Sequence, residues 1–206
     1  MAKAGDELVN PVIGLRTVFR KTARETGGEL LRVDWIGEPG WTTGPDHVHP
    51  RQEERFEVLS GKLGLRVEGV ERVLDEGEVI VAPAGSAHAA WNASSDDKVH
   101  ALVDFRPALR TETAFEALAG LARDGKTNGA GAPKNPLMLA LVLRTYEEEI
   151  YFVRPPLFVQ RVVFGALAKI ARLLGYTAEY PYPYPRRSEA PAWWDDPTRP
   201  GRSGAL

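Results

Sequence analysis

The feature that most constrains this chain is a pair of histidines two residues apart, followed by two adjacent glutamates. His47 and His49 lie in the stretch GPDHVHPRQEERF, which begins at Gly44. Side chains two residues apart on a strand point to the same face, so both imidazoles can reach one ion. Pro50 interrupts the strand after the pair, because proline cannot donate to a β-ladder. The interruption allows a later side chain to face the same point despite an odd spacing.

Alternation along the next strand selects which glutamate faces inward. Phe56 and Val58 have the same parity as Glu54, whereas Glu53 has the opposite parity. A strand with one wet face buries its apolar side. We therefore expect Glu54 to point into the interior and Glu53 to be a solvated neighbour. An irregular start to the strand would exchange the two.

A third histidine follows a tight turn farther along the chain. The turn Pro83-Ala84-Gly85 ends one strand, so His88 starts a new strand and can enter the interior. The candidate metal ligands are three imidazoles and one carboxylate, from His47, His49, Glu54 and His88. Such a set suits one divalent transition metal ion per chain, Fe, Mn, Ni, Cu or Zn, and is too rich in nitrogen for Mg or Ca.

Both segments resemble the two motifs of the cupin superfamily. The first motif, G-x5-H-x-H-x3-4-E-x6-G, is met by His47, His49, Glu54 and Gly61, with Trp41 where a glycine is expected. The second, G-x5-P-x-G-x2-H-x3-N, is met by Gly77, Pro83, Gly85, His88 and Asn92. The resemblance implies a single-domain, bacterial-type cupin with a small antiparallel, jelly-roll-like β-barrel that holds a metal ion.

The first half of the chain contains a succession of short apolar runs. Runs over 12–20 and 29–36 predict a hairpin, and further alternating runs extend to Phe105. A dense series of short strands favours an antiparallel barrel or sandwich over a parallel α/β sheet. We therefore expect a mainly β fold with C-terminal helices.

Beyond Pro107 the apolar residues repeat at helical spacing. The pattern predicts helices from Thr111 to Asp124, from Leu137 to about Phe152 and from Pro156 to Leu174. We therefore divide the chain into a β-barrel over 1–107, a helical extension over 108–176 and a Pro- and Tyr-rich tail over 177–206. The extension is expected to pack on the barrel or on a partner subunit.

The tail begins with a Tyr-Pro repeat over 180–185. Such a repeat favours an extended, polyproline-like strap that clasps the barrel. Beyond Arg186 we expect the tail to be mobile unless Trp193 and Trp194 dock.

The last predicted helix combines an apolar face with Arg161, Lys169 and Arg172 on one sector. Two interpretations remain open. The apolar face packs on the barrel or on a second subunit, as in a homodimer, or it lies on an anionic membrane surface as a peripheral contact. The three cations interrupt any run of the ~20 apolar residues that a membrane span needs.

Composition narrows the classes of protein. The chain has 206 residues, of which 43% are hydrophobic, enough for one sizeable core. A net charge of −2 provides no basic field for nucleic acid. Without cysteine there is neither a disulfide framework nor a thiolate ligand. Residues 1–10 lack the apolar core of a signal peptide, so a cytoplasmic location is expected.

Two further side chains have both a structural and a functional interpretation. Trp41 either anchors its loop on the rim of the barrel or forms the mouth of a pocket. His100 lies outside both motifs. It either forms a local hydrogen bond on its strand, or faces inward with Leu102 and Asp104 and orients a ligand.

Three classes of function fit these residues. The similarity to ring-cleaving dioxygenase cupins implies a metal-dependent oxygenase acting on a small, largely apolar, oxygen-bearing molecule inside the barrel. Phe56, Val58 and Leu65 are expected to line its pocket, and Glu54 to be both a ligand and the catalytic base. The alternatives are a redox-neutral isomerase, decarboxylase or hydrolase, with Arg51 as a nearby cation, and a non-catalytic cupin that binds a small molecule.

Overall fold

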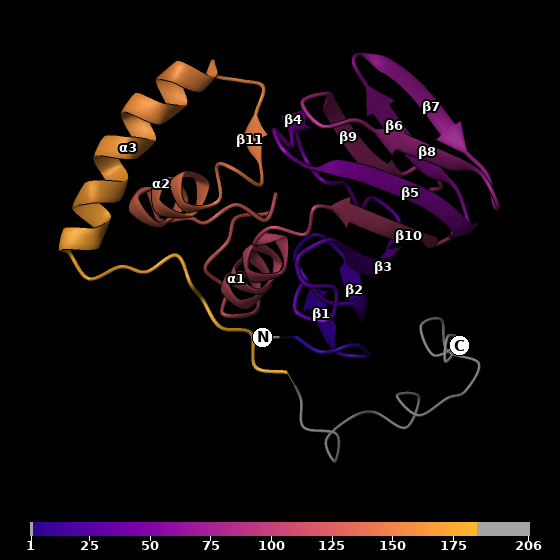
Figure 1. Cartoon of the computed structure of the whole chain (residues 1–206), viewed down its shortest axis with the longest axis horizontal. Coiled ribbons are helices and arrows are strands. Elements are labelled where there is room, and N and C mark those ends of the chain that lie inside the picture. The colour runs from indigo at the N-terminus through magenta and orange to yellow at the C-terminus, as the bar shows by residue number, and fades with distance from the viewer. Residues whose placement is uncertain (1, 185–206) are drawn as a thin grey trace.

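Two antiparallel sheets face each other in the computed structural model, which describes residues 2–184 (Figure 1). The first sheet has the strand order β1 (Glu7–Asn10), β2 (Leu15–Lys21), β3 (Leu31–Gly37), β10 (Val99–Arg106), β5 (Glu53–Ser60) and β8 (Val79–Ala82). The second has the order β11 (Tyr151–Phe152), β4 (His47–Val48), β9 (Ala87–Asn92), β6 (Leu63–Val67) and β7 (Val70–Leu74). Three helices come after β10: α1 (Thr111–Arg123), α2 (Pro136–Thr145) and α3 (Leu157–Leu173). The predicted mainly β fold with C-terminal helices is confirmed.

Alternation along the strands decides which side chains enter the core between the sheets. Val103 and Phe105 of β10, Phe56 and Val58 of β5, and Trp35 of β3 are all buried in one hydrophobic cluster. Burying one such side chain contributes roughly 1.5–3 kcal/mol. The positions of opposite parity on these strands carry most of the polar side chains, as expected of an antiparallel sheet with one wet face.

His100 lies on the outer face of the first sheet. Its Nε2 atom is 2.9 Å from Oδ1 of Asp34, and Arg20 donates two hydrogen bonds to the same carboxylate at 2.8 and 2.9 Å. Burial works to raise the pKa of Asp34, but the hydrogen bonds with His100 and Arg20 outweigh it and lower that pKa. Asp104 has the same parity and accepts two hydrogen bonds from Arg32. The interpretation in which His100 faces inward is therefore wrong, and the local hydrogen bond is what the structure shows.

The second helix is shorter than the apolar pattern predicts. Asn135 caps its N-terminus by accepting hydrogen bonds from two backbone N–H groups, and the helix ends at Thr145 instead of near Phe152. The chain then turns at Tyr146, which is buried, and returns to the sandwich as β11. β11 pairs with β4 and forms the edge of the second sheet. Its two residues therefore make sheet hydrogen bonds with a strand that is remote in sequence, instead of continuing the helix. Helical periodicity alone does not reveal that competition.

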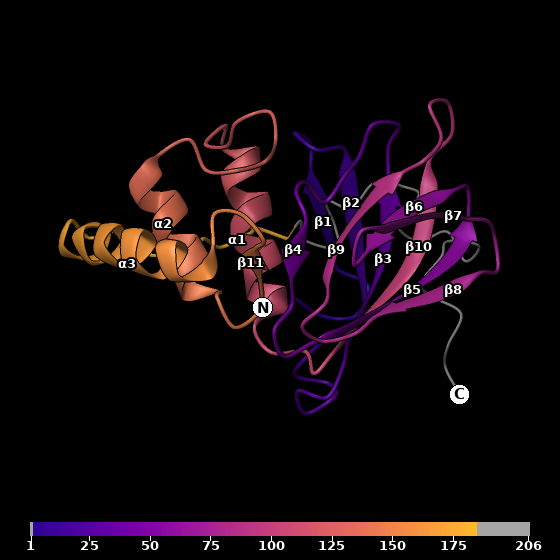
Figure 2. The ribbon, with the colours of Figure 1, turned by 90° about the horizontal axis from the view of Figure 1, so that it is seen from above.

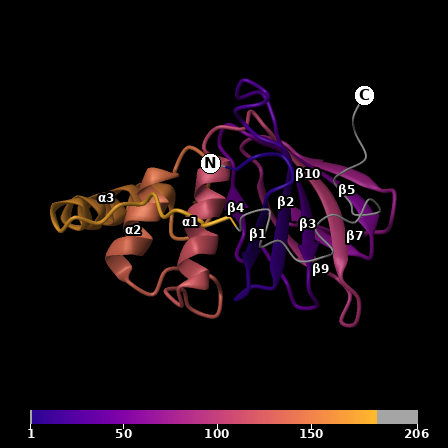
Figure 3. The same cartoon turned by 90° about the horizontal axis from the view of Figure 1, so that it is seen from below.

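The helices lie at one end of the sandwich, with α1 next to it and α3 farthest away (Figures 2 and 3). Gln52 joins the two regions at their boundary. Its buried amide donates hydrogen bonds to the carbonyls of Pro107 and Ala108 and to the hydroxyl of Thr111, at 2.7, 3.0 and 2.8 Å. The start of β5 is thereby tied to the start of α1.

The described part of the tail runs across α1 and the edge of the first sheet. Tyr182 accepts a hydrogen bond from the backbone of Val9 at 3.2 Å, and Tyr184 donates one to Glu116 at 2.9 Å. The tyrosine repeat therefore reaches both α1 and β1. The expectations for Trp193 and Trp194 concern positions outside the described residues.

Candidate metal centre

The three motif histidines and one glutamate converge between the two sheets. His47 of β4 is the direct cross-strand partner of His88 of β9, while Glu54 belongs to β5 in the opposite sheet. His49 follows the end of β4. All four side chains are buried, and one candidate donor atom from each lies within 4.8 Å of the others. The structure thus brings together every residue that the sequence proposed as a ligand.

Each imidazole turns one nitrogen to a backbone carbonyl. Nδ1 of His47 lies 3.2 Å from the Pro45 carbonyl oxygen, and Nδ1 of His88 lies 3.1 Å from that of Ser86. Nδ1 of His49 contacts the carbonyl of Glu149, which belongs to the connection between α2 and β11. An Nδ1–H donated to a carbonyl leaves Nε2 unprotonated and free to bind a metal, and it fixes the orientation of the ring. All three rings have this arrangement.

Glu54 provides the test of whether a cation fits. Its Oε2 atom is 2.9 Å from Nε2 of His88 and 3.2 Å from Nε2 of His49. In the metal-free chain these two contacts need a proton on each Nε2 in addition to the proton on each Nδ1. The His49 and His88 rings would then both be cations, with centroids 5.2 Å apart. One divalent ion in place of the two Nε2 protons satisfies the same three groups.

The electrostatics of His47 and Glu54 agree with that substitution. Burial, together with the neighbouring imidazoles of His49 and His88, lowers the pKa of His47 to about 3, so this ring is neutral. Burial works to raise the pKa of Glu54, but its contacts with His49 and His88 prevail and lower it to about 2. Within residues 2–184 its other oxygen, Oε1, is buried and has no hydrogen-bond partner. Burial works to lower the pKa of His88, but its contact with Glu54 prevails and raises it. A neutral His47, an ionised carboxylate and a spare buried oxygen suit a transition metal ion, which would take the place of the proton between His88 and Glu54.

The two adjacent glutamates differ in burial as the strand parity predicts. Glu54 is buried, whereas Glu53 is partly exposed. Arg51 does not reach the cluster, because its side chain is 59% exposed and its guanidinium pairs with Glu148 at 2.6 Å. Trp41 is buried against Trp35, with ring centroids 5.5 Å apart. Trp41 also lines the pocket described next, so its two interpretations both apply.

A cavity of about 160 Å³ lies beside His47 and His49. The sandwich contributes Leu8, Leu15, Trp35 and Phe105 to its wall, and the helical region contributes Phe115, Leu118 and Ile150. In the part of the chain that the structure describes, no Lys, Arg, Asp or Glu lines it. The cavity therefore has mainly apolar walls, and its polar lining residues are Asn10, Thr17, Thr43, His47 and His49.

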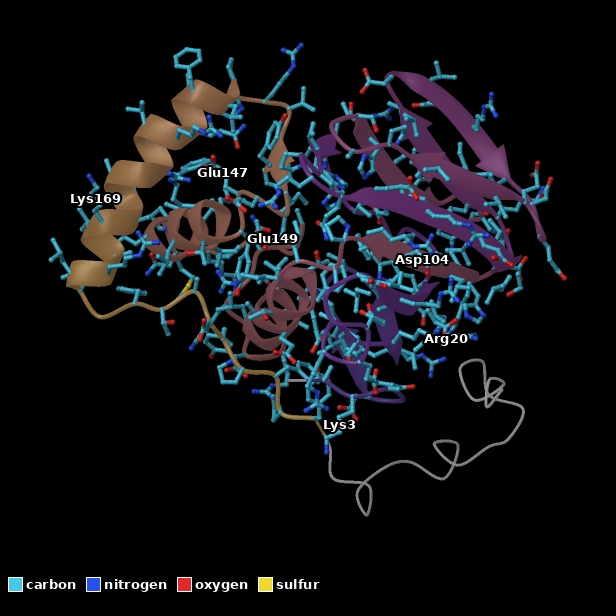
Figure 4. The ribbon with its side chains drawn as sticks, in the orientation of Figure 1. Lys3, Arg20, Asp104, Glu147, Glu149 and Lys169 are labelled. Atoms are coloured by element: carbon cyan, nitrogen blue, oxygen red, sulfur yellow. The ribbon has the colours of Figure 1, made fainter. Side chains whose placement is uncertain are left out.

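The pocket is not where the sequence placed it. Phe56, Val58 and Leu65 were expected to form its walls, but they lie in the closed core between the sheets. The cavity instead lies between the sandwich and the helical region, where Phe115 and Leu118 of α1 and Ile150 line one of its sides. Sequence reasoning also missed Glu149, which holds His49 and is labelled in Figure 4 between the helices and the sandwich. Nothing in the acidic run over 147–149 distinguishes the residue whose carbonyl is used.

Part of the chain is similar in sequence to known proteins. A family model described as a cupin domain matches residues 34–104. A protein of Arthrobotrys oligospora that is named an oxidoreductase is 32% identical over 152 residues, which cover 66% of this chain and 58% of the relative. The chain thus spans little more than half the length of that relative.

Solved structures with similarity to the chain include small cupins. An RmlC-like cupin from Shewanella frigidimarina is 22% identical, and the match covers 52% of this chain and 88% of that one with a TM-score of 0.43. A predicted oxalate decarboxylase from Thermotoga maritima is 16% identical, with 52% and 98% covered and a TM-score of 0.45. By the match of the family model, residues 34–104 are a domain of the cupin superfamily.

Proposed function

We propose that this cupin is a metal-dependent oxidoreductase, an oxygenase that acts on a small, largely apolar molecule with an oxygen-bearing end. The observation that carries the proposal is that the buried cluster of three histidines and one glutamate adjoins a cavity with mainly apolar walls, which His47 and His49 help to line. The name of the Arthrobotrys oligospora relative supports the redox class.

His47, His49 and His88 would hold the ion through Nε2, and Glu54 would complete the set with its carboxylate. When bound, a divalent Fe, Mn, Ni or Cu ion supplies Lewis acidity and redox chemistry with dioxygen, whereas Zn supplies Lewis acidity alone. Four protein ligands leave room for small molecules on a five- or six-coordinate ion. The contacts of the three Nδ1 atoms with carbonyls keep the rings oriented whether or not a substrate is present.

The cavity indicates the kind of substrate. An apolar protein cavity of about 150 Å³ stays dry and takes up benzene, so about 160 Å³ suits a single small ring or a short branched chain. The oxygen-bearing end of such a molecule would lie against His47 and His49, because the rest of the wall is largely aliphatic and aromatic. A substrate that displaces water from this space would strengthen the electrostatic contacts within it.

The lining of the cavity also disfavours one of the redox-neutral enzymes, a sugar-phosphate isomerase. A phosphate needs cationic donors, and in the described chain no Lys or Arg lines the cavity. Arg51, the one cation that the sequence placed near the site, pairs with Glu148 instead. An uncharged substrate remains compatible with a redox-neutral reaction.

Glu54 is the proposed catalytic residue. Its unpartnered Oε1 atom is the buried acceptor for a proton from a substrate hydroxyl. A carboxylate whose pKa is lowered to about 2 is a weak base. Proton acceptance therefore requires Glu54 to exchange its contacts with His49 and His88 for the substrate. Ligation is its first role, and proton transfer is an additional one.

The test is metal content and oxygen uptake in His88→Ala, with His100→Ala as the matched control. Chain reconstituted in turn with Fe(II), Mn, Ni and Cu is tested in an oxygen electrode against phenols and diketones. We expect substrate-dependent uptake with at least one metal. His88→Ala should lose both the metal and the uptake, whereas His100→Ala, on the outer face, should retain both.

Two results would contradict the proposal. Turnover of a substrate under strict anaerobiosis, without oxygen uptake in air, would move the protein to the redox-neutral class. Equal loss of metal in His88→Ala and His100→Ala would show that the histidine cluster is not the metal site.

A further inference from the structure

Helix α3 exposes most of its large apolar side chains. Five of them, Phe158, Val162, Val163, Ile170 and Leu173, are exposed, as is Leu174 directly after the helix, and four of these six are exposed by more than 60% of their surface. The residues that α3 buries are Gln160, Ala168 and Ala171, and its half-buried apolar residues are Leu157, Val159, Phe164 and Leu167. Monomeric soluble proteins rarely expose a contiguous apolar patch larger than a few hundred Å². The barrel does not cover this face.

The exposed residues lie on one side of the helix. At 3.6 residues per turn, Phe158, Val162 and Leu173 fall on adjacent positions opposite Ala171. Ile170 and Val163 extend the same side. We call this set of residues, together with Leu174, the α3 outer face. Figure 2 shows α3 at the end of the molecule remote from the sandwich, with nothing drawn beyond it.

Cations accompany the α3 outer face and acids do not. The segment from Val153 to Gly175 contains Arg154, Arg161, Lys169 and Arg172 but no Asp or Glu, in a chain whose net charge is −2. Lys169 is labelled in Figure 4 on the side of α3 that faces away from α2. Arg161 pairs with Glu147.

Three of these four cations have no acidic partner in the part of the chain that the structure describes. Among residues 2–184, Arg154, Lys169 and Arg172 form no ion pair with a carboxylate. All three are exposed. Their charges are therefore available to an external anionic surface.

This charge pattern separates two candidate occupants. In a symmetric dimer each α3 outer face meets its own copy, so the cations of one helix approach those of the other, and like charges repel. An anionic lipid surface instead attracts Lys and Arg, while its interface accepts the apolar side chains. None of the described helices is long and apolar enough to cross a bilayer, so contact would be with one leaflet. We propose that the α3 outer face binds peripherally to a bilayer containing anionic lipids.

The test is co-sedimentation of the full chain with vesicles. Phosphatidylcholine vesicles containing phosphatidylglycerol should bind the protein, and phosphatidylcholine alone should bind it far less. Raising the salt from about 0.1 M to about 1 M shortens the screening length and should weaken binding. Lys169→Gln with Arg172→Gln should weaken the partition roughly 30-fold, at about 1 kcal/mol for each cation.

A second pair of variants separates apolar insertion from general charge effects. Val162→Glu with Leu173→Glu should abolish sedimentation with vesicles. Val70→Glu with Val73→Glu is the matched control, because these two valines of β7 are 61% and 55% exposed but lie on the sandwich. The control should bind as well as the parent, and circular dichroism checks that both variants are folded.

Several outcomes would overturn the proposal. One is the absence of binding to anionic vesicles by the parent chain. Another is equal binding by both glutamate pairs. A third is a dimer in sedimentation velocity that Val162→Glu with Leu173→Glu dissociates, with no vesicle binding, because the α3 outer face would then be covered by a second copy. None of these results depends on metal content or turnover, so the proposed function is tested separately.

Discussion

The strand-rich region, residues 7–106, and the helical region after it cover their apolar side chains differently. In the strands that the structure describes, the exposed large hydrophobic residues are all valines, whereas α3 exposes Phe158, Ile170 and Leu173 as well. A strand of the sandwich faces a second sheet, so alternation decides burial one residue at a time. A helix that is apolar on several sides must leave one of them open. The burial of a strand residue can therefore be predicted from its immediate sequence neighbours, whereas that of a helix residue depends on what packs against the helix.

The two regions also differ in how they hold the histidines. Pro45 and Ser86, each two residues before the ring that it contacts, hold His47 and His88 within the sandwich. His49 depends on the carbonyl of Glu149, a hundred residues away in the chain. The helical region is thus a structural part of the candidate metal centre, and it also roofs the cavity.

The largest expected effect tests whether the sandwich by itself defines the metal ligands. Glu54→Gln removes the anionic ligand and should weaken metal affinity by more than about 100-fold, since even groups that hydrogen-bond to a ligand are worth roughly 10–100-fold. Glu53→Gln, at the neighbouring position of opposite parity, should leave metal content unchanged. Elemental analysis of both variants measures the difference. The reverse result would mean that the strand is displaced by one residue from the structure described here.

A smaller effect concerns the outer face of the sandwich. Asp34→Asn should lower the free energy of unfolding by about 2 kcal/mol at pH 7, because a buried carboxylate loses its charge beside Arg20 and His100. The folded pKa of Asp34 is below its unfolded value, so its contribution is complete above the ordinary value of about 3.9 and is lost as the pH falls through the folded pKa. Urea unfolding at pH 7 and at lower pH should show the two chains converge in acid.

The control for that measurement is Asp75→Asn. Asp75 is 66% exposed and pairs with Lys62 on the surface, and such pairs are worth at most about 1 kcal/mol. If both variants lose the same stability at pH 7, the network of Asp34 with Arg20 and His100 contributes no more than a surface pair.

The smallest effect sharpens the role of the helical region at the metal. Glu149 is buried, and its side chain accepts a hydrogen bond from the backbone N–H of Arg110 at 3.1 Å, which helps to place its carbonyl against His49. Glu149→Ala should weaken metal affinity about tenfold. Glu148→Ala removes an exposed ion pair with Arg51 and should change nothing measurable. Metal titration of both variants measures the two affinities. Equal affinities would show that the contact of Glu149 with His49 does not contribute to metal binding.

The sequence was sufficient for the strand-rich region and for the four side chains that the structure brings together in the buried cluster. Spacing placed His47 and His49 on one face, and parity selected Glu54 over Glu53, as the structure shows. Both patterns are local, because a strand repeats every two residues whatever its partner. The same reasoning was less reliable for α2, whose end depends on pairing between β11 and β4.

The amino-acid sequence by itself determined the cupin motifs, the inward glutamate, the presence of three helices and the basic, acid-free character of α3. Only the tertiary structure decided that Phe115, Leu118 and Ile150 line the cavity, and that Glu149 holds His49. It also decided that α3 buries Ala168 and Ala171 and leaves Phe158, Val162 and Leu173 exposed. The physical reason is that residue type and spacing specify which face of an element is apolar, whereas packing between remote segments specifies what that face meets.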